Sequence, residues 1–305
     1  MAVRAFTVIN QLGESLRIEL AKPRESGFRV DDIRGLTPPK ATINTSKIST
    51  LDGTIYNSAQ LEGRNIVLTL GLLSVNTVEE ARLKSYRHFP IKGEVSLIFE
   101  TDNRTAIATG YVESNEPTMF AKEIQTTISI VCPDAYMLDA SENNIISTEF
   151  FSQEPRFEFP FSNESLTTPL IELGALVAIE SEVINYPGDG ETGIVISIHV
   201  LGPTTNVVVY NVRTNESMRI DTDRLFEMTG AGLIAGDHIV INTQKGKKGI
   251  TLYRGSSVYN ILNALDRDVD WLIFSKGPNE ITYDALTGVG NLQVTVESPI
   301  LYEGV

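Results

Sequence analysis

Several residue types are scarce or absent in this chain of 305 residues. The single cysteine, Cys132, excludes an internal disulfide, so the fold does not depend on an oxidising compartment. No stretch approaches the roughly 18 consecutive apolar residues that a membrane-spanning helix needs. The N-terminal residues also lack the apolar run of a signal peptide. These absences predict a soluble protein that is synthesised in the cytoplasm and has no membrane partner.

Basic residues are also in deficit, because 25 Lys and Arg face 39 Asp and Glu, which gives a formal charge of −14. Wrapping around nucleic acid requires clustered Lys and Arg to bind the phosphates, so the net negative charge argues against this class of function. An acidic surface still allows DNA to pass, because it repels phosphates without holding them. The alternative interpretation is that the surplus carboxylates simply keep the surface soluble.

Catalytic signatures are missing. The chain has no GxSxG elbow, no HExxH pair and no phosphate-binding loop. The three histidines, His88, His199 and His238, fall in different expected elements, and Cys132 is expected to be a small buried apolar residue. A paired-carboxylate hydrolase remains a third hypothesis, but nothing in the sequence places two carboxylates together. We therefore expect no enzymatic activity, no cofactor and no metal site.

The length allows one large domain or two ordinary ones. Residues 134–165 are rich in Asn, Ser, Glu, Phe and Pro and show no sustained period, which is typical of a boundary. We place the division there, to within about ten residues, with domains 1–150 and 151–305.

In the first half, one helix and several strands are expected. Thr77 is suited to cap a helix over Val78–His88, with Glu80 three residues later as in a capping box. Residues 41–51 are polar and only weakly alternating, Asp52–Gly53 is a turn signal, and 56–64 resembles a loop with edge character. The strands are predicted from alternating or apolar runs: 6–10, 15–20, 28–36, 65–71, 94–99, 106–112 and 125–131.

The second half is expected to contain strands alone, separated by turn signals, as in a β-sandwich. The uncertain stretch is Leu225–Met228. Pro155–Phe161 alternates between prolines and is expected to be an edge or a linker. The candidate strands are 145–151, 170–173, 177–185, 193–201, 207–211, 217–221, 238–242, 249–254, 271–274, 280–283 and 292–298.

Two groups of motifs carry a family resemblance. YRHFP, FETDNR, GYVESNEPTMF and ISIVCPD, in this order, resemble the N-terminal domain of the distal tail (Dit) proteins of long-tailed bacteriophages. NYPGDGETG, GDHIVINT, KKGITLYRG and WLIFSKGPNEI resemble the C-terminal domain of the same family. The resemblance implies a mainly β fold: an N-terminal β-barrel or sandwich-like, ring-forming (belt) domain with one α-helix, and a C-terminal galectin-like β-sandwich.

The resemblance also implies a structural function in the virion. Six copies would form a ring hub at the tail tip, or baseplate. The hub would join the tail tube protein to the tail-associated hub protein and to receptor-binding or accessory tail-tip proteins, with DNA only passing through its lumen. Synthesis would take place in the host cytoplasm. The alternative function is a carbohydrate-binding module that aids adsorption to the host surface.

Few residues are candidates for these contacts. Arg82, Lys84 and Arg87 follow two glutamates on the expected helix and are either a solvated face or part of a contact between subunits. Trp271 is the candidate carbohydrate contact, although its apolar neighbours favour a core strand. In Gly188–Gly193, two carboxylates are too few for a calcium ion, so we interpret this segment as a hairpin turn.

Overall fold

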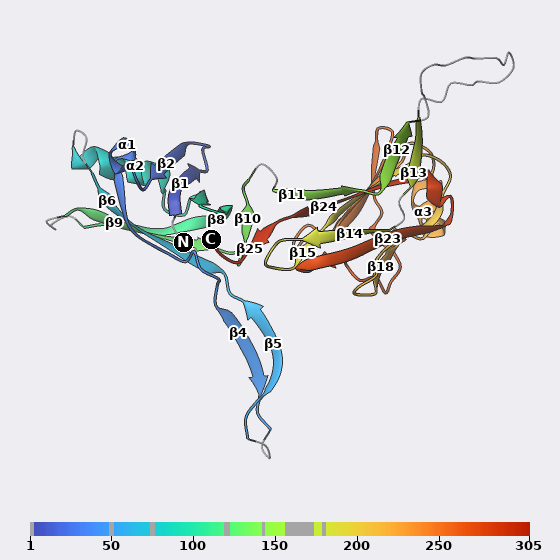
Figure 1. The fold of residues 1–305 in the computed structure, drawn as a ribbon, viewed down its shortest axis with the longest axis horizontal. Helices are drawn as coiled ribbons and strands as arrows, with labels where there is room; N and C mark the ends of the chain where they lie inside the picture. The colour runs from blue at the N-terminus through green and yellow to red at the C-terminus, as the bar shows by residue number, and fades with distance from the viewer. Residues whose placement is uncertain are drawn as a thin grey trace, which may run out of the picture. The chain divides into compact units, whose positions relative to one another are not determined.

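The structure is a computed structural model that describes residues 3–48, 52–73, 77–118, 123–141, 144–155, 174–178 and 181–305. The chain is mainly β and forms two compact units (Figure 1). The first unit comprises Met1–Asn144 and Leu301–Val305, and the second comprises Ile145–Ile300. The division therefore lies six residues before the expected one, and the last five residues of the chain return to the first unit. Among the described residues, no helix is long and apolar enough to cross a membrane.

The first unit is organised around one antiparallel sheet in the order β2-β1-β7-β8-β9-β6-β3. Short strand β10 pairs with both β8 and the C-terminal strand β25. The bounds are β1 (Val3–Asn10), β2 (Ser15–Glu19), β3 (Phe28–Arg34), β6 (Arg64–Leu72), β7 (Glu94–Thr101), β8 (Thr105–Pro117), β9 (Gln125–Cys132), β10 (Met137–Asp139) and β25 (Leu301–Tyr302). All the strands predicted for this sheet are confirmed, although several bounds differ by a few residues.

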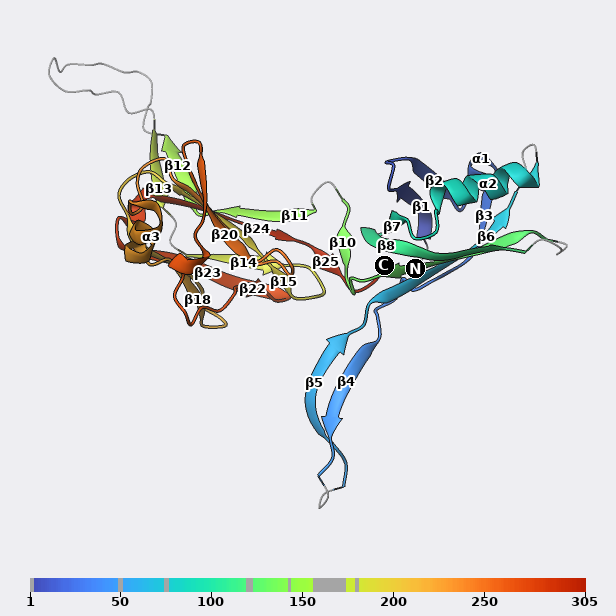
Figure 2. The ribbon, with the colours of Figure 1, turned by 180° about the vertical axis from the view of Figure 1, so that it is seen from behind.

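Alternate residues of these strands are buried, as the period-two patterns require. In β9, Ile128, Ile130 and Cys132 are buried, and in β7 the same holds for Leu97 and Phe99. These side chains share one core with those of β1 and β6. The core occupies the face of the sheet on which α2 lies (Figure 2).

Helix α2 (Val78–His88) has the predicted bounds. The hydroxyl of Thr77 accepts a hydrogen bond from the Glu80 backbone N–H at 3.3 Å, which confirms the expected cap. The helix buries Ala81, Ser85 and His88. One helix was expected in this half, but a second, one-turn helix, α1 (Pro23–Ser26), precedes β3. It ends at Gly27, whose φ of 82° suits a glycine.

Arg64, at the start of β6, is 4% exposed and binds three separate backbone segments. Its guanidinium donates to the carbonyls of Ala135 (3.0 Å from Nε), Gly35 (3.1 Å) and Glu303 (2.8 Å). Burial lowers the pKa of Arg64 from its ordinary value, because the cation has left water. The neutral carbonyls compensate this cost and anchor the C-terminal segment to the sheet.

Replacing Arg64 with methionine (Arg64→Met) should destabilise the protein by about 2–5 kcal/mol, because buried carbonyls lose their donors. Urea unfolding followed by circular dichroism measures this loss. The control is Arg34→Met, because Arg34 has a side chain that is 78% exposed. An equal, small effect of both substitutions would contradict the anchoring role.

Strands β4 (Ala41–Ser46) and β5 (Ile55–Leu61) form a two-stranded hairpin of their own. Figures 1 and 2 show it projecting from the main sheet of the first unit. The prediction of a loop over 56–64 is therefore wrong for most of that range. The reason is that pairing with β4 supplies backbone hydrogen bonds that the weakly patterned sequence does not announce.

The second unit contains two principal antiparallel sheets, β11-β24-β16-β19-β20-β21 and β14-β23-β17-β18. Two smaller pairs, β12-β13 and β15-β22, accompany them. The bounds are β11 (Ile145–Glu149), β12 (Phe151–Pro155), β13 (Gly174–Ala178), β14 (Ser181–Tyr186), β15 (Thr192–Gly193), β16 (Val195–Val200), β17 (Thr205–Asn211), β18 (Glu216–Arg219), β19 (His238–Asn242), β20 (Gly249–Arg254), β21 (Ser257–Asn260), β22 (Ile273–Phe274), β23 (Gly277–Thr287) and β24 (Leu292–Pro299).

The two principal sheets share one core, which is the arrangement of a sandwich. Ile196 and Ile198 of β16 belong to the same buried cluster as Val207 and Val209 of β17 and Tyr283 of β23. This confirms the expected mainly β class. The predicted strand 170–173 and most of Pro155–Phe161 lie outside the described residues.

The stretch left uncertain, Leu225–Met228, is helical: α3 runs from Thr222 to Thr229. The side chain of Asp221 caps it by accepting from the backbone N–H groups of Asp223 and Arg224. Gly230 ends it with a φ of 78°. The expectation of strands alone is therefore wrong here, and short 3₁₀ turns also occur at Leu262–Ala264 and Val289–Asn291.

A buried ion pair holds the loop that follows α3. Asp237 is fully buried, and its carboxylate accepts from Nε (2.8 Å) and Nη2 (2.7 Å) of Arg254. The same guanidinium donates to the carbonyl of Gly232 at 2.6 Å, while the backbone N–H of Ile234 donates to Asp237 at 3.0 Å. The pair thus sets the path of residues 231–237.

The substitution Asp237→Asn should destabilise the second unit by about 3–5 kcal/mol, because Arg254 would keep a buried charge without its counter-ion. Urea unfolding of the full chain provides the measurement. Asp268→Asn, at an exposed position, is the matched control. Equal unfolding midpoints for the two variants would refute the role assigned to this ion pair.

Candidate assembly surfaces

The hairpin β4–β5 is an unusual surface, because almost all of its residues are exposed and none of those in its two strands is charged. Four large apolar side chains in and beside it are exposed: Ile43 (54%), Ile48 (39%), Ile55 (50%) and Tyr56 (63%). Its internal side-chain bonds are polar, such as Asn57 to Ser46 at 2.6 Å. An isolated two-stranded hairpin is marginally stable in water, so this one gains most from a partner.

The edges of the hairpin are also open. Neither β4 nor β5 pairs with any other described strand. Monomeric proteins usually protect such edges with charges, proline or a covering segment, because free N–H and C=O groups act as a template for another chain. The absence of charge from these two strands makes the hairpin the strongest candidate for a contact with another polypeptide.

The predicted interface cations of α2 lie on its surface, and each has a partner within its own chain. Arg82 pairs with Glu79 at 2.5 Å and lies 5.9 Å from the ring centre of Tyr86. The ammonium group of Lys84 donates to the Ser26 carbonyl at 2.8 Å. These bonds brace the helix, and a contact between subunits through these residues stays a prediction.

Arg87 makes a bidentate ion pair with Glu14, in the turn between β1 and β2. Nε of Arg87 lies 2.9 Å from Oε2 of Glu14. Hydrogen bonding from Arg87, together with that from Asn10, lowers the pKa of Glu14 from 4.5 to about 2. The pair joins the end of α2 to the first hairpin of the sheet.

The Glu14–Arg87 pair should therefore contribute stability above pH 4.5 and lose that contribution as the pH falls towards about 2, because the unfolded carboxyl protonates first. The difference in unfolding free energy between wild type and Glu14→Gln should shrink over this range. Urea unfolding at several pH values tests it. The control is Glu116→Gln, at an exposed position; a difference that stays constant with pH would contradict the pairing.

The sequence offered two interpretations of Trp271, a carbohydrate contact or part of an apolar core strand. The strand in this stretch, β22, begins two residues later, at Ile273. The side chain of Trp271 is half-buried and packs against the core of the second unit. The ammonium group of Lys248 lies 5.3 Å from the centre of its ring. These two neighbours leave less of the ring for a sugar, and the carbohydrate contact at Trp271 stays a prediction.

Residues Gly188–Gly193 do not form a hairpin turn, because β14 and β15 belong to different sheets. The segment is a connection between them, so the hairpin interpretation is wrong. Asp189 forms an ion pair with Lys276 at 2.9 Å. A Cβ on Gly188 would lie 2.2 Å from the hydroxyl of Tyr186, so the tight packing requires glycine. Among the described residues, no cluster of three metal-binding side chains is present.

Cys132 and the three histidines are the remaining candidates for a chemical function. Burial raises the pKa of the Cys132 thiol to about 11 and lowers that of the His88 imidazole. A thiol of this kind is a poor nucleophile, since the thiolate is the reactive form. His199 and His238, expected in separate elements, face each other across β16 and β19 with ring centres 6.3 Å apart.

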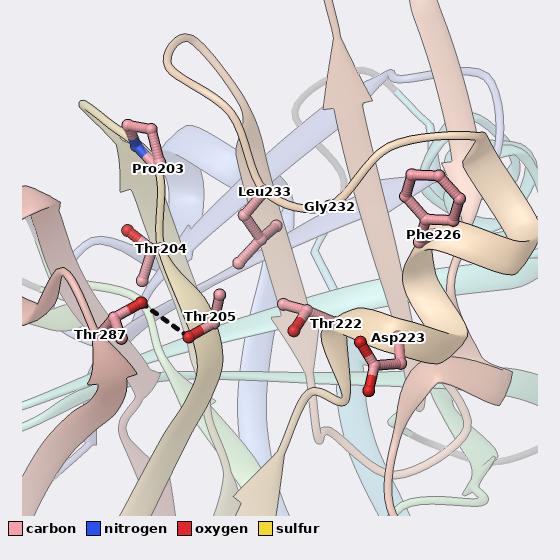
Figure 3. Close-up of a pocket in the computed structure, with 9 residues that line it drawn as sticks. All are labelled: Pro203, Thr204, Thr205, Thr222, Asp223, Phe226, Gly232, Leu233 and Thr287. Carbon is pink, nitrogen blue, oxygen red and sulfur yellow. Dashed lines mark hydrogen bonds between the residues drawn. The ribbon is translucent and has the colours of Figure 1, made fainter.

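The second unit also contains a hollow of about 240 Å³ beside α3 (Figure 3). It is lined by Pro203, Thr204, Thr205, Thr222, Asp223, Phe226, Gly232, Leu233 and Thr287. Sequence reasoning missed this site. The sequence offered one local signal near it, Asp221 as a cap for α3. The residues that line the hollow come from segments that are distant in the sequence.

The two units together define a class: a mainly β chain in which a helix-covered sheet with a projecting hairpin is followed by a sandwich. No protein-family model and no curated protein matches the chain. Solved structures do. The crystal structure of the Dit protein of phage SPP1 matches with a TM-score of 0.62 and 12% sequence identity, covering 96% of this chain and 98% of that one.

That SPP1 protein is described as a paradigm of the hub adsorption apparatus in phages that infect Gram-positive bacteria. The activated baseplate of phage P2 contains a chain that also covers the full length, at 13% identity, but its TM-score of 0.45 carries no weight here. The resemblance to the distal tail proteins is therefore confirmed at the level of the fold, over almost the whole chain.

Proposed function

We propose that this chain is a structural protein of a phage tail tip. Six copies form a ring hub that joins the tail tube to the tail-associated hub protein and to the receptor-binding apparatus. The observation that carries the proposal is the full-length likeness of fold to the SPP1 Dit protein. Because the likeness includes both units and is not limited to a common sandwich, it favours an assembly component over a free-standing lectin or a hydrolase.

The β4–β5 hairpin supports this function independently of the likeness. A ring requires each copy to present two different patches to its two neighbours. A projecting, uncharged hairpin with open edges is suited to lie against the next copy, where its strands and apolar side chains leave water. A stable contact of this kind needs about 800 Å² from each partner.

Charge sets a condition on the assembly. Six copies carry a formal charge of −84, which is six times −14, so the contacts must overcome repulsion. Salt screens charges beyond about 10 Å at 0.1 M, and the uncharged hairpin strands add no repulsion of their own. Ring formation should therefore be favoured by moderate salt.

The mass of the particle tests the proposal. Six copies of 33.5 kDa give about 201 kDa. Light scattering or sedimentation of the full chain should show this mass, and a larger mass when the chain is mixed with its tail-tube and hub partners. Electron microscopy should show rings. Monomers under all of these conditions would overturn the hexameric hub.

A double variant of the hairpin, Ile43→Ser with Tyr56→Ser, should shift the particle towards monomers at a given concentration without altering the fold, because both side chains are mostly exposed. We expect at least a tenfold weaker assembly, about 1.4 kcal/mol. The matched control is Val183→Ser with Leu286→Ser, two similarly exposed apolar residues of the second unit. Rings that persist unchanged in the hairpin variant would place the contact elsewhere.

A further inference from the structure

We propose that the hollow beside α3 is a binding site for one uncharged hexopyranose unit of a glycan. The site is distinct from Trp271, and it goes beyond the structural function, because sugar binding at one copy does not require a ring. The proposal rests on the geometry of the residues that surround the hollow (Figure 3).

An exposed aromatic ring forms one wall. Phe226, on α3, is 58% exposed although it is a large apolar residue, and it lines the hollow on the side away from Thr204, Thr205 and Thr287 (Figure 3). The axial C–H bonds of a pyranose pack well on the negatively polarised face of such a ring. Phe226 therefore offers an uncovered ring to a ligand in the hollow.

Hydrogen-bonding side chains also line the hollow. The hydroxyls of Thr205 and Thr287 lie 2.7 Å apart and share one hydrogen bond. Whichever of them donates, the other keeps its own proton for a ligand, and both keep accepting lone pairs. The carboxylate of Asp223 also lines the hollow and can accept hydrogen bonds from the hydroxyls of a ligand. Donors, acceptors and an apolar face are the combination that a sugar ring presents.

Several bonds fix the hollow in place before any ligand binds. The amide oxygen of Asn206 accepts from both the backbone N–H and the hydroxyl of Thr222, each at 3.1 Å, which ties β17 to α3. Asn206 adopts a φ of 49°, a conformation that is uncommon outside glycine and typical of constrained sites. The Asp237–Arg254 pair holds the carbonyl of Gly232 in the wall. A preorganised site loses less entropy on binding.

The volume of the hollow and the charge around it limit which ligands can bind. About 240 Å³ is smaller than the roughly 300–1,000 Å³ of sites for drug-sized molecules, so one sugar ring fits rather than an oligosaccharide. The Asp223 carboxylate and the formal charge of −14 disfavour sulfated sugars, uronic acids and sugar phosphates. A site with so few contacts should bind with a dissociation constant of about 1–10 mM.

Titration of the full-length, isotope-labelled protein with a panel of methyl hexopyranosides and N-acetylhexosamines tests the site, with amide chemical shifts as the readout. At least one of these neutral sugars should shift the amides of Thr205, Asp223, Phe226 and Gly232 in the millimolar range. Glucuronate should not. The shifts report the site in any assembly state, so this result is independent of the mass measurement that tests the ring.

The variants Phe226→Ala and Asp223→Asn should each weaken binding by roughly tenfold, about 1.4 kcal/mol. Tyr253→Ala, an exposed aromatic elsewhere in the unit, and Glu227→Gln, an exposed carboxylate on the same helix, should leave it unchanged. Unperturbed amides elsewhere establish that each variant is folded. The proposal is overturned if no neutral sugar shifts these amides, if both site variants bind as tightly as wild type, or if only a lysine-containing peptide binds.

Discussion

Alternate side chains along the strands of the main sheet of the first unit and of the two principal sheets of the second must leave water, because each of these sheets has one face against a core. This constraint fixes the register of the strand pairs in these sheets: a slip of one residue would carry the apolar set of β9 or β16 to solvent. Ile128 and Ile130 meet the core of the first unit, while Ile196 and Ile198 meet that of the second. The loops, helices and hairpin of each unit are connected to the sheets around its core.

Buried ionic groups fix loop segments that apolar packing alone does not hold. Arg64 binds carbonyls from three segments of the first unit, and Asp237 binds Arg254 below the loop after α3 in the second. Both arrangements supply hydrogen bonds to backbone groups of loops, which have no partner in a neighbouring strand. A buried charge is costly unless fully bonded, so each of these groups specifies one loop path and penalises others. The loop after α3 forms a wall of the hollow, which links this ionic pair to the proposed sugar site.

The β4–β5 hairpin departs from the constraint that governs the rest. Its strands bury almost nothing, carry no charge and leave both edges unpaired. In contrast, Arg82, Lys84 and Arg87 of α2 each have a partner in their own chain. Exposed ion pairs contribute little to stability, whereas unpaired backbone and exposed apolar side chains gain from a partner, so the hairpin is the stronger candidate for a contact.

Local sequence patterns determined the positions of many helices and strands in this protein. Thr77 and the 3.6-residue period of Val78–His88 specified α2, and period-two runs specified strands such as β7, β9, β19 and β20, because these signals depend on near neighbours alone. Tertiary structure decided the rest. The return of Leu301–Val305 to the first unit and the gathering of Thr205, Phe226 and Thr287 around one hollow join residues far apart in the chain. Such contacts form only when the whole core closes, so no local signal in the sequence encodes them.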